Sequence, residues 1–279
     1  MSAPGYEWPT ALRVELDAGV ATVTIDHGPI NLFDLVLYPE MVRLAGQLAA
    51  DDDVRVVVLR SANPDFFIAH FDVSLIQRIP TDLPEPTELN DFHRMCEAFR
   101  TMPKATIAVI EGRVGGGGSE LALSCDMRFA ALGRAVFNQP EVALGILPGG
   151  SGTVRLPRLV GRSRALEVIL GCDDIDAATA ERWGWVNRAL PPDDLWPAVD
   201  RLARRIAGFP PHAVAAAKAA VLRADVAIEE HLLREGGAFN ATLGHPATVA
   251  ALQAFLDRGG QTREGELRLG ELAGELTGE

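Results

Sequence analysis

The sequence predicts an α/β protein with a core in which two strands and a helix repeat as a coil, followed by a helical C-terminal region. Residues 54–59 (VRVVVL) and 106–110 (TIAVI) are continuous apolar runs, typical of parallel strands buried on both faces. Helical segments separate these runs, and the alternation favours parallel sheets with right-handed crossovers. From about residue 163 the composition becomes helical. We therefore place the spiral α/β core in residues 1–200 and the helical region in residues 201–279.

The N-terminal elements are predicted to be a hairpin and a helix. Residues 12–16 and Val20–Ile25 alternate apolar and polar side chains, and the intervening DAG is typical of a hairpin turn. Residues 35–50 carry apolar side chains at helical spacing, and Asp34 is the expected N-cap. A hairpin and one helix are thus expected before the first buried strand.

The central segments alternate between loop, helix and strand. Residues 81–88 (TDLPEPTE) are polar and contain two prolines, so we expect a mobile surface loop there. Residues 88–102 predict a helix that ends at Pro103. After the second apolar run and a stretch of glycines, residues 118–125 predict a short helix and Met127–Ala131 a further strand.

The C-terminal part is predicted to be mainly helical. Asp176 is placed to cap a helix in the sequence AATAERWG. Further helices are expected over residues 193–208, 211–224, 229–243 and 248–258. The last residues, GELRLGELAGELTGE, are acidic and interrupted by glycines, so we expect them to be frayed.

Charge and composition exclude several classes of partner. The formal net charge is −12, from 38 acidic and 26 basic residues, and such a surface repels nucleic acid. Only Lys104 and Lys218 are lysines, so arginines must supply most contacts to any anionic ligand. No apolar run approaches the roughly 20 residues that span a bilayer, and the first residues lack the layout of a signal peptide. The sequence therefore predicts a cytoplasmic protein with neither membrane nor nucleic acid as partner.

Three cysteines, Cys96, Cys125 and Cys172, are scattered along the chain. They are too few for a disulfide framework, and none has a His or Cys nearby at metal-ligand spacing. We expect reduced, buried thiols and no metal site.

A glycine run in GRVGGGGSELA (residues 112–122) is the first segment that could carry chemistry. It joins a buried strand to an apolar helix, where backbone N–H groups can approach a ligand and the helix N-terminus favours negative charge. Tight packing of the helix against the strand explains the glycines equally well. The spacing does not match a nucleotide-binding P-loop.

Two glutamates lie in or near such segments. Glu120 follows the glycines in the expected first turn of the helix, where it could simply complement the helix dipole. Glu141 comes 21 residues later, after Gln139-Pro140, and by itself could be an ordinary surface residue. The aromatic segment FFIAHFD (residues 66–72) is by itself more typical of a core.

Taken in this order, three segments closely resemble the crotonase superfamily, that is, the enoyl-CoA hydratase/isomerase family. They are VRVVVLRSANPDFFIAHFDVSLI, KATIAVIEGRVGGGGSELALSCDMRFA and AVFNQPEVALGILPGGSGTVRLPRLVG, and the match extends over roughly residues 12–258. The resemblance implies a crotonase-like ββα spiral that binds a coenzyme A thioester. It implies no metal or redox cofactor, because coenzyme A is part of the substrate.

The resemblance also implies a set of site residues. By motif position, the backbone N–H groups of Phe71 and Gly117 would form an oxyanion hole for the thioester, and Glu120 and Glu141 would be the acid–base pair. Fixed donors stabilise the enolate charge as it develops, and two carboxylates can divide the proton transfers. Substrate contacts are expected from Ile68, Ala69, His70, Gly116, Pro140 and Gly149, and the Gly149 N–H would help to position water.

The division of labour between the glutamates is left open by the resemblance. One hypothesis is that one glutamate activates water for C3 while Glu141 protonates C2. In similar hydratases, however, both carboxylates hold the water. Relatives that only isomerise double bonds usually need just the carboxylate at the position of Glu141, so the presence of Glu120 favours hydration.

The chain departs from the family pattern at His70, where the family normally has glycine. A glycine-like conformation would strain a histidine there and disturb the Phe71 donor. Alternatively, His70 lines the thioester pocket as a titratable group, or the loop is altered without a chemical role. In addition, Gly244-His245-Pro246 replaces an acidic pair, which could alter subunit contacts or the acyl pocket.

The leading functional hypothesis is hydration of a 2-enoyl-CoA to a 3-hydroxyacyl-CoA. The alternatives are an isomerase or another crotonase-type acyl-CoA reaction, a non-catalytic CoA-binding paralogue, and an oligomeric scaffold. The resemblance implies a homotrimer or a dimer of trimers, with the helical region supplying contacts and covering the acyl pocket. Candidates for CoA phosphate contacts, by charge alone, are Arg155, Arg158, Arg162 and Arg164, for which a solvated face is the other reading.

Overall fold

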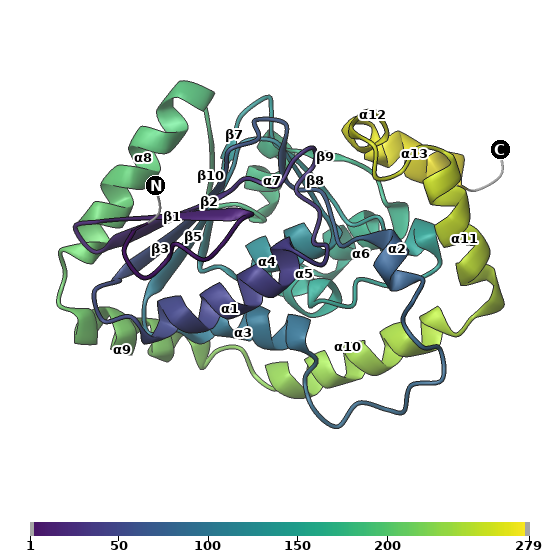
Figure 1. The fold of residues 1–279 in the computed structure, drawn as a ribbon, viewed down its shortest axis with the longest axis horizontal. Coiled ribbons are helices and arrows are strands. Elements are labelled where there is room, and N and C mark those ends of the chain that lie inside the picture. The colour runs from purple at the N-terminus through teal and green to yellow at the C-terminus, as the bar shows by residue number, and fades with distance from the viewer. Residues whose placement is uncertain (1–2, 277–279) are drawn as a thin grey trace.

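The computed structural model describes residues 3–276 and contains two sheets (Figure 1). The larger sheet has the strand order β1-β2-β3-β5-β7-β10, and all its neighbours are parallel except β1 and β2. Its strands are β1 (Leu12–Asp17), β2 (Val20–Ile25), β3 (Val56–Ser61), β5 (Ala105–Ile110), β7 (Met127–Ala131) and β10 (Arg188–Leu190).

The smaller sheet has the order β4-β6-β8-β9, with only β8 and β9 antiparallel. Its strands are β4 (Phe66–Ile68), β6 (Arg113–Gly115), β8 (Val136–Asn138) and β9 (Ile175–Asp176). The chain visits the two sheets in turn: β3 is followed by β4, β5 by β6, and β7 by β8, and helices follow each pair. The predicted coil of two strands and a helix is therefore confirmed.

Helices pack against both sheets. They are α1 (Leu37–Ala50), α2 (Val73–Ile76), α3 (Asp91–Thr101), α4 (Gly116–Ser124), η1 (Glu141–Leu144, 3₁₀), α5 (Gly152–Val160), α6 (Arg162–Gly171), α7 (Ala177–Trp183), α8 (Pro192–Ala207), α9 (Pro211–Leu222), α10 (Ile228–Leu243), α11 (Pro246–Asp257), α12 (Arg263–Leu267) and α13 (Leu269–Glu275). Figure 1 shows α8 and α9 at one end of the molecule, and α11 to α13 at the other, beside α2.

The predicted N-terminal hairpin and helix are confirmed with small shifts at the helix and strand starts, but the N-cap of the helix is Val36 and not Asp34. The hairpin turns at Ala18 and Gly19, both with positive φ. Asp34 Oδ1 accepts hydrogen bonds from the N–H groups of Val36 (2.8 Å) and Leu37 (3.0 Å), so it satisfies the start of α1, which begins two residues later than predicted. Likewise β3 begins at Val56, two residues later than predicted, because residues 51–54 form the turn that follows α1, with the Val54 N–H donating to the Asp51 carbonyl.

Residues 81–90 form neither helix nor strand and are mostly exposed, which confirms a surface loop. The helix predicted from residue 88 begins only at Asp91, because Asn90 is its cap and accepts a hydrogen bond from the His93 N–H (2.8 Å). Conversely, α4 begins at Gly116, inside the glycine run, two residues earlier than predicted. Glu120 therefore lies in the second turn of α4 rather than the first.

The prediction of a frayed C-terminus is wrong for the described residues. Helices α12 and α13 are ordered elements, and Leu272 is 0% exposed in an apolar cluster with Val73, Leu144 and Phe255. The apolar residues of this segment pack at helical spacing, although acidic residues and glycines dominate its composition. Residues 277–279 lie outside the described part of the chain.

The predicted cap and helices of the C-terminal part, and the buried free cysteines, are confirmed. Asp176 caps α7 by accepting a hydrogen bond from the Thr179 N–H (2.7 Å), as predicted, and the helices from α8 to α11 match the predicted ranges within two residues. All three cysteines are buried and free. Within residues 3–276, no helix combines the length and apolar character needed to cross a bilayer. In the same part of the chain, no cluster of His, Cys, Asp and Glu is arranged to hold a metal ion.

Candidate active site

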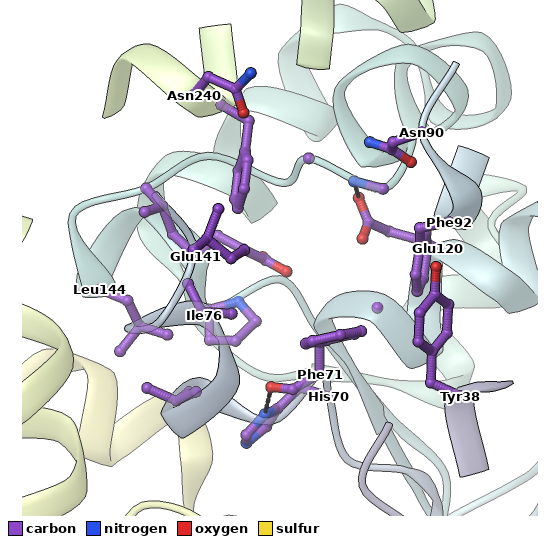
Figure 2. A pocket seen from close by; sticks show the side chains of 18 of the residues that line it. Tyr38, His70, Phe71, Ile76, Asn90, Phe92, Glu120, Glu141, Leu144 and Asn240 are labelled. Carbon is purple, nitrogen blue, oxygen red and sulfur yellow. Dashed lines mark hydrogen bonds between the residues drawn. The ribbon is translucent and has the colours of Figure 1, made fainter. Parts of the chain in front are cut away.

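A cavity of about 350 Å³ lies between the spiral core and the C-terminal helices (Figure 2). Most of the predicted site residues line it, although they come from four separate segments. They are His70, Phe71, Gly117, Glu120, Pro140, Glu141 and Gly149. Ile68, Ala69 and Gly116, which were predicted to contact substrate, are buried beside it and do not belong to its wall.

Gly116 has a definite packing role between two of the lining residues. A Cβ atom at this position would lie 2.9 Å from Glu141 Oε1 and 2.9 Å from the Cβ of His70, and its φ is +44°. Neither the space nor the backbone conformation accepts a side chain. The glycine run therefore serves tight packing at Gly116, while its neighbour Gly117 faces the cavity.

Phe71 and Gly117 each present a backbone N–H that ordinary secondary structure does not use. Gly117 is the second residue of α4, so its N–H is among those without a partner inside the helix. The Phe33 N–H donates to the His70 carbonyl (3.0 Å), and the Asp72 N–H donates to the Phe33 carbonyl (3.1 Å). In this parallel bridge the N–H of Phe71 points away from Phe33.

Glu120 is held at one oxygen by two backbone donors. Its Oε1 accepts hydrogen bonds from the N–H groups of Gly150 (2.8 Å) and Gly152 (2.7 Å), at the turn that leads into α5. A Cβ on Gly150 would lie 2.4 Å from Glu120 Oε2, so that turn must carry glycine. The carboxylate is thus fixed at Oε1.

Glu141 approaches the same space from the other side (Figure 2). It begins the 3₁₀ turn η1 directly after Pro140, and the turn ends at Gly145, whose φ is +78°. The side chain is buried, and Glu141 Oε2 has no hydrogen-bond partner among residues 3–276. A buried carboxyl oxygen without a partner is costly for stability, which marks it as a group kept for chemistry.

The environment raises the pKa of both carboxyl groups. Burial raises the pKa of Glu141 to about 7. Burial, together with the charges of Glu141 and Glu235, raises the pKa of Glu120 well above its usual range, although the two backbone donors oppose the shift. Two carboxyl groups with raised pKa values can share one proton near neutral pH, which is what paired acid and base catalysis needs.

Glu235 is a buried third carboxylate that the sequence did not indicate. It lies on α10, near the His93 Nε2 (3.3 Å), and it also accepts a hydrogen bond from the Thr153 hydroxyl. Its only signal in the sequence is an acidic residue directly before Gly236-Gly237 in an otherwise amphipathic helix.

His70 is not strained, contrary to the expectation for a residue in a glycine position. It is absent from the non-glycine residues with positive φ. Its Nδ1 contacts the Phe71 carbonyl oxygen (2.8 Å) and its Nε2 contacts Glu266 Oε1 (2.9 Å). Burial lowers the pKa of His70, but the Glu266 carboxylate more than offsets this and raises it to about 9. Of the alternatives, the structure favours a pocket-lining titratable group.

The rest of the cavity wall is apolar and aromatic. Tyr38, Phe71 and Phe92 contact one another through their rings, with centroid distances of 5.3–6.2 Å. The wall is completed by Val73, Ile76, Ile79, Leu83, Leu144, Ile146 and Phe239, with Gly150 and the polar residues Asn90, Asp91 and Asn240. Apart from Phe71, sequence reasoning missed these residues, because core-like apolar residues carry no separate signal.

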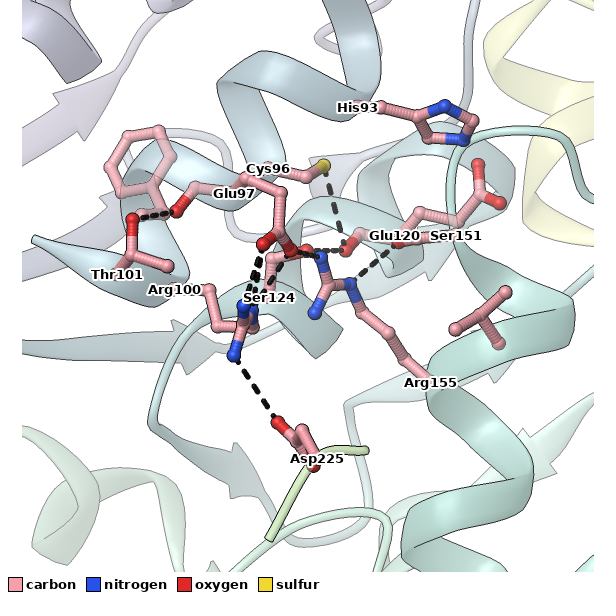
Figure 3. A network of polar contacts seen from close by, with 12 residues as sticks. His93, Cys96, Glu97, Arg100, Thr101, Glu120, Ser124, Ser151, Arg155 and Asp225 are labelled. Carbon is pink, nitrogen blue, oxygen red and sulfur yellow. Dashed lines mark hydrogen bonds and ion pairs between the residues drawn. The ribbon is translucent and has the colours of Figure 1, made fainter. Parts of the chain in front are cut away.

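Arg155 is not available to bind a phosphate group. It is buried in a polar network in which it donates to Glu97 and, from Nε, to the Ser151 hydroxyl (2.9 Å) (Figure 3). Arg100 joins the same network through Glu97 and Asp225. The candidate set for phosphate contacts therefore contracts to Arg158, Arg162 and Arg164, which are exposed.

The raised pKa of Glu141 has a consequence for stability. An exposed glutamate titrates near 4.5, so the folded state binds this proton more tightly between pH 4.5 and about 7, and the free energy of unfolding falls as pH rises through that range. Glu141→Gln removes the ionisable group and therefore removes this fall in the free energy of unfolding. We expect the variant to be more stable than wild type by about 1–3 kcal/mol at pH 8, with a smaller difference at pH 5.

Denaturant unfolding at both pH values and one protein concentration measures this difference. Glu167→Gln, at an exposed position on α6, is the control and should change stability little at either pH. A Glu141→Gln variant no more stable than wild type at pH 8 would show that Glu141 is not held in an unfavourable charged state.

Comparison with known proteins gives one consistent family. A family model described as "Enoyl-CoA hydratase/isomerase" matches residues 15–263. The short-chain-enoyl-CoA hydratase of Clostridium acetobutylicum is 33% identical over 251 residues, covering 88% of this chain and 94% of that protein.

Solved structures agree with this result. A Streptomyces avermitilis protein, solved as a candidate enoyl-CoA hydratase, is 39% identical with a TM-score of 0.88, covering 97% of this chain and all of the other. An enoyl-CoA hydratase from Mycobacterium avium subsp. paratuberculosis is 26% identical with a TM-score of 0.78, covering 88% and 98% of the two chains.

Proposed function

The chain belongs to the enoyl-CoA hydratase/isomerase family, and on that premise we propose that it hydrates a 2-enoyl-CoA to the 3-hydroxyacyl-CoA. The observation that supports this most is the pair of buried carboxyl groups, Glu120 and Glu141, on the wall of one apolar cavity. Adding water across a conjugated double bond requires one proton to leave water and another to reach C2. The pair offers a base and an acid for these two transfers.

The first step is polarisation of the thioester. The N–H groups of Phe71 and Gly117 bind the thioester oxygen, and the N-terminus of α4 adds its positive end at the same point. Charge moves onto this oxygen as water attacks C3 and an enolate forms. Donors fixed beforehand stabilise that charge without reorganising, and removing one such donor typically costs about 10²–10³ in kcat.

The two glutamates then divide the proton transfers. With Oε1 held by Gly150 and Gly152, Glu120 is oriented to take a proton from water through Oε2 as the oxygen bonds to C3. Glu141 gives its proton to C2 as the enolate collapses to the saturated thioester. The pair holds one proton before and after the step, on Glu141 first and on Glu120 afterwards, and that proton returns to Glu141 before the next turnover.

The cavity fits the acyl part of the substrate. Its volume of about 350 Å³ is at the lower end of small-molecule sites, and most of the residues of its wall beyond the glutamates are apolar. We expect a hydrocarbon acyl chain to lie against Ile76, Leu144 and Phe239, with most of coenzyme A outside the cavity. A double-bond isomerase would need only one carboxylate, whereas the two donors that hold Glu120 suit a residue that handles water.

We further propose the homotrimer or dimer of trimers that the sequence resemblance implies. Supporting it, α9 has no buried residue, and Val221 within it and Val226 after it are 72% and 75% exposed. A cytoplasmic location and the absence of metal or redox cofactors stay predictions.

A panel of thioesters tests the reaction type. We expect loss of the conjugated-thioester absorbance with crotonyl-CoA and with a longer 2-enoyl-CoA, and only slow conversion of a 3-enoyl-CoA to its 2-isomer. Rapid isomerisation without hydration would favour the isomerase. Tight acyl-CoA binding without any turnover would favour a non-catalytic paralogue.

A further inference from the structure

A buried ion pair joins the thioester side of the cavity to the C-terminal segment. His70 and Glu266 are 196 residues apart in the chain, and they are only 4% and 1% exposed. His70 Nε2 lies 2.9 Å from Glu266 Oε1. Glu266 belongs to α12, in the segment that the sequence predicted to be frayed.

The contacts of the imidazole define its charge. A carbonyl oxygen can only accept, so Nδ1 must donate its hydrogen to the Phe71 carbonyl (2.8 Å). Glu266 Oε1 accepts a second hydrogen bond from the Gln261 N–H (2.7 Å), which favours the carboxylate form. Both ring nitrogens therefore donate, and His70 is an imidazolium paired with a carboxylate.

This cation sits directly beside the peptide that carries the Phe71 N–H. The carbonyl on one side of that N–H, of His70, accepts from Phe33, and the carbonyl on the other side, of Phe71, accepts from the His70 ring. Both neighbouring carbonyl groups are thus fixed, and with them the direction of the N–H between them. His70 and Glu141 also flank Gly116, so the cation lies close to the reacting groups.

The C-terminal segment holds the same loop at further points. Gln261 Nε2 donates to Asp72 Oδ1 (2.9 Å), and Gln261 Oε1 accepts from the Val73 N–H. Leu269 and Leu272 anchor the segment in the apolar cluster beneath α2. Gln261 and Glu266 therefore form the back of the loop at residues 70–73, although they lie at the far end of the chain.

We propose that His70, paired with Glu266, is a positioning residue that aims the Phe71 N–H at the thioester oxygen and places a fixed positive charge behind the developing enolate. The inference rests on the proposed oxyanion role of Phe71. It assigns the C-terminal segment a part in thioester activation, and it gives the histidine in the usual glycine position a function.

The test uses the full-length protein and a thioester that cannot be hydrated. Butanoyl-CoA labelled with ¹³C at the thioester carbon reports polarisation through its carbonyl stretching frequency in infrared difference spectra. We expect wild type to lower this frequency relative to free butanoyl-CoA, and His70→Asn and Glu266→Gln to reverse most of the shift. With crotonyl-CoA, kcat should fall by roughly 10–100-fold in each variant, while KM changes little.

A matched control separates positioning from general loosening of the C-terminal segment. Arg263, also on α12, pairs with Asp65 away from the cavity, so Arg263→Gln should keep the wild-type frequency and kcat. The double variant His70→Asn/Glu266→Gln leaves no unpaired buried charge. It provides the measurement if either single variant fails to fold.

The outcomes separate this inference from the proposed hydration. A wild-type frequency in the His70 and Glu266 variants, or in the double variant, would overturn the positioning role, as would an equal change in Arg263→Gln. If wild type polarises butanoyl-CoA in a His70-dependent way but does not hydrate crotonyl-CoA, the positioning role stands and the proposed reaction is wrong.

Discussion

Replacing Glu120 with glutamine is expected to reduce kcat for hydration of crotonyl-CoA by about 10²–10⁴-fold, the usual contribution of one acid–base residue. The amide cannot accept the proton of the attacking water, and it would place an uncharged group where two N–H donors now bind a carboxylate oxygen. KM should change far less, because the acyl chain and the thioester oxygen contact other residues. Steady-state kinetics by loss of the conjugated-thioester absorbance measure both.

Two further variants sharpen this prediction. Gly150→Ala would put a methyl group 2.4 Å from Glu120 Oε2, so it should lower kcat although it leaves the carboxylate in the chain. Glu167→Gln, on the exposed face of α6, should be indistinguishable from wild type. Near-normal hydration by Glu120→Gln would mean that a single carboxylate is sufficient, and the two-base mechanism would be wrong.

Replacing Glu141 with glutamine should also reduce kcat by about 10²–10⁴-fold, but through a different proton. Glu141 is proposed to serve C2, so its loss should also abolish exchange of the C2 hydrogens of butanoyl-CoA with D₂O. That exchange needs no attack by water and should survive in Glu120→Gln. Proton NMR of butanoyl-CoA with each variant separates the two roles.

The control for this experiment is the combination of both substitutions. Because the two groups act in one step, the double variant should be little slower than the slower single variant. If C2 hydrogen exchange is lost in Glu120→Gln and kept in Glu141→Gln, the two glutamates have the opposite roles to those assigned here. Exchange lost in both would mean that the carboxyl groups handle the C2 proton jointly.

Local pattern was sufficient to predict much of the fold. The buried runs around β3 and β5, the alternation with helices and the turn at Ala18-Gly19 all depend on neighbouring residues, and all were predicted. Several helices and strands begin two or three residues away from their predicted starts. The start of a helix depends on which side chain accepts a hydrogen bond from its first free N–H groups, as Asn90 does for α3. The α13 segment was misjudged because its few apolar residues find partners far away in the chain.

For the site as well, residues within local motifs could be predicted, whereas residues whose role depends on contacts distant in the sequence could not. The motifs placed Glu120, Glu141, Phe71 and Gly117 on one cavity, as the structure shows. They could not indicate Glu266, because its significance comes only from the contact with a residue nearly 200 positions earlier. Glu235, Tyr38 and Phe92 were missed for the same reason.

The central claim is that the wild-type protein adds water across the double bond of a 2-enoyl-CoA. Incubation with crotonyl-CoA in D₂O, followed by proton NMR, tests it most directly. We predict 3-hydroxybutanoyl-CoA with one deuterium at C2, formed at a rate that falls at least a hundredfold in Glu120→Gln and in Glu141→Gln. A wild-type reaction that yields no 3-hydroxyacyl product would contradict the claim.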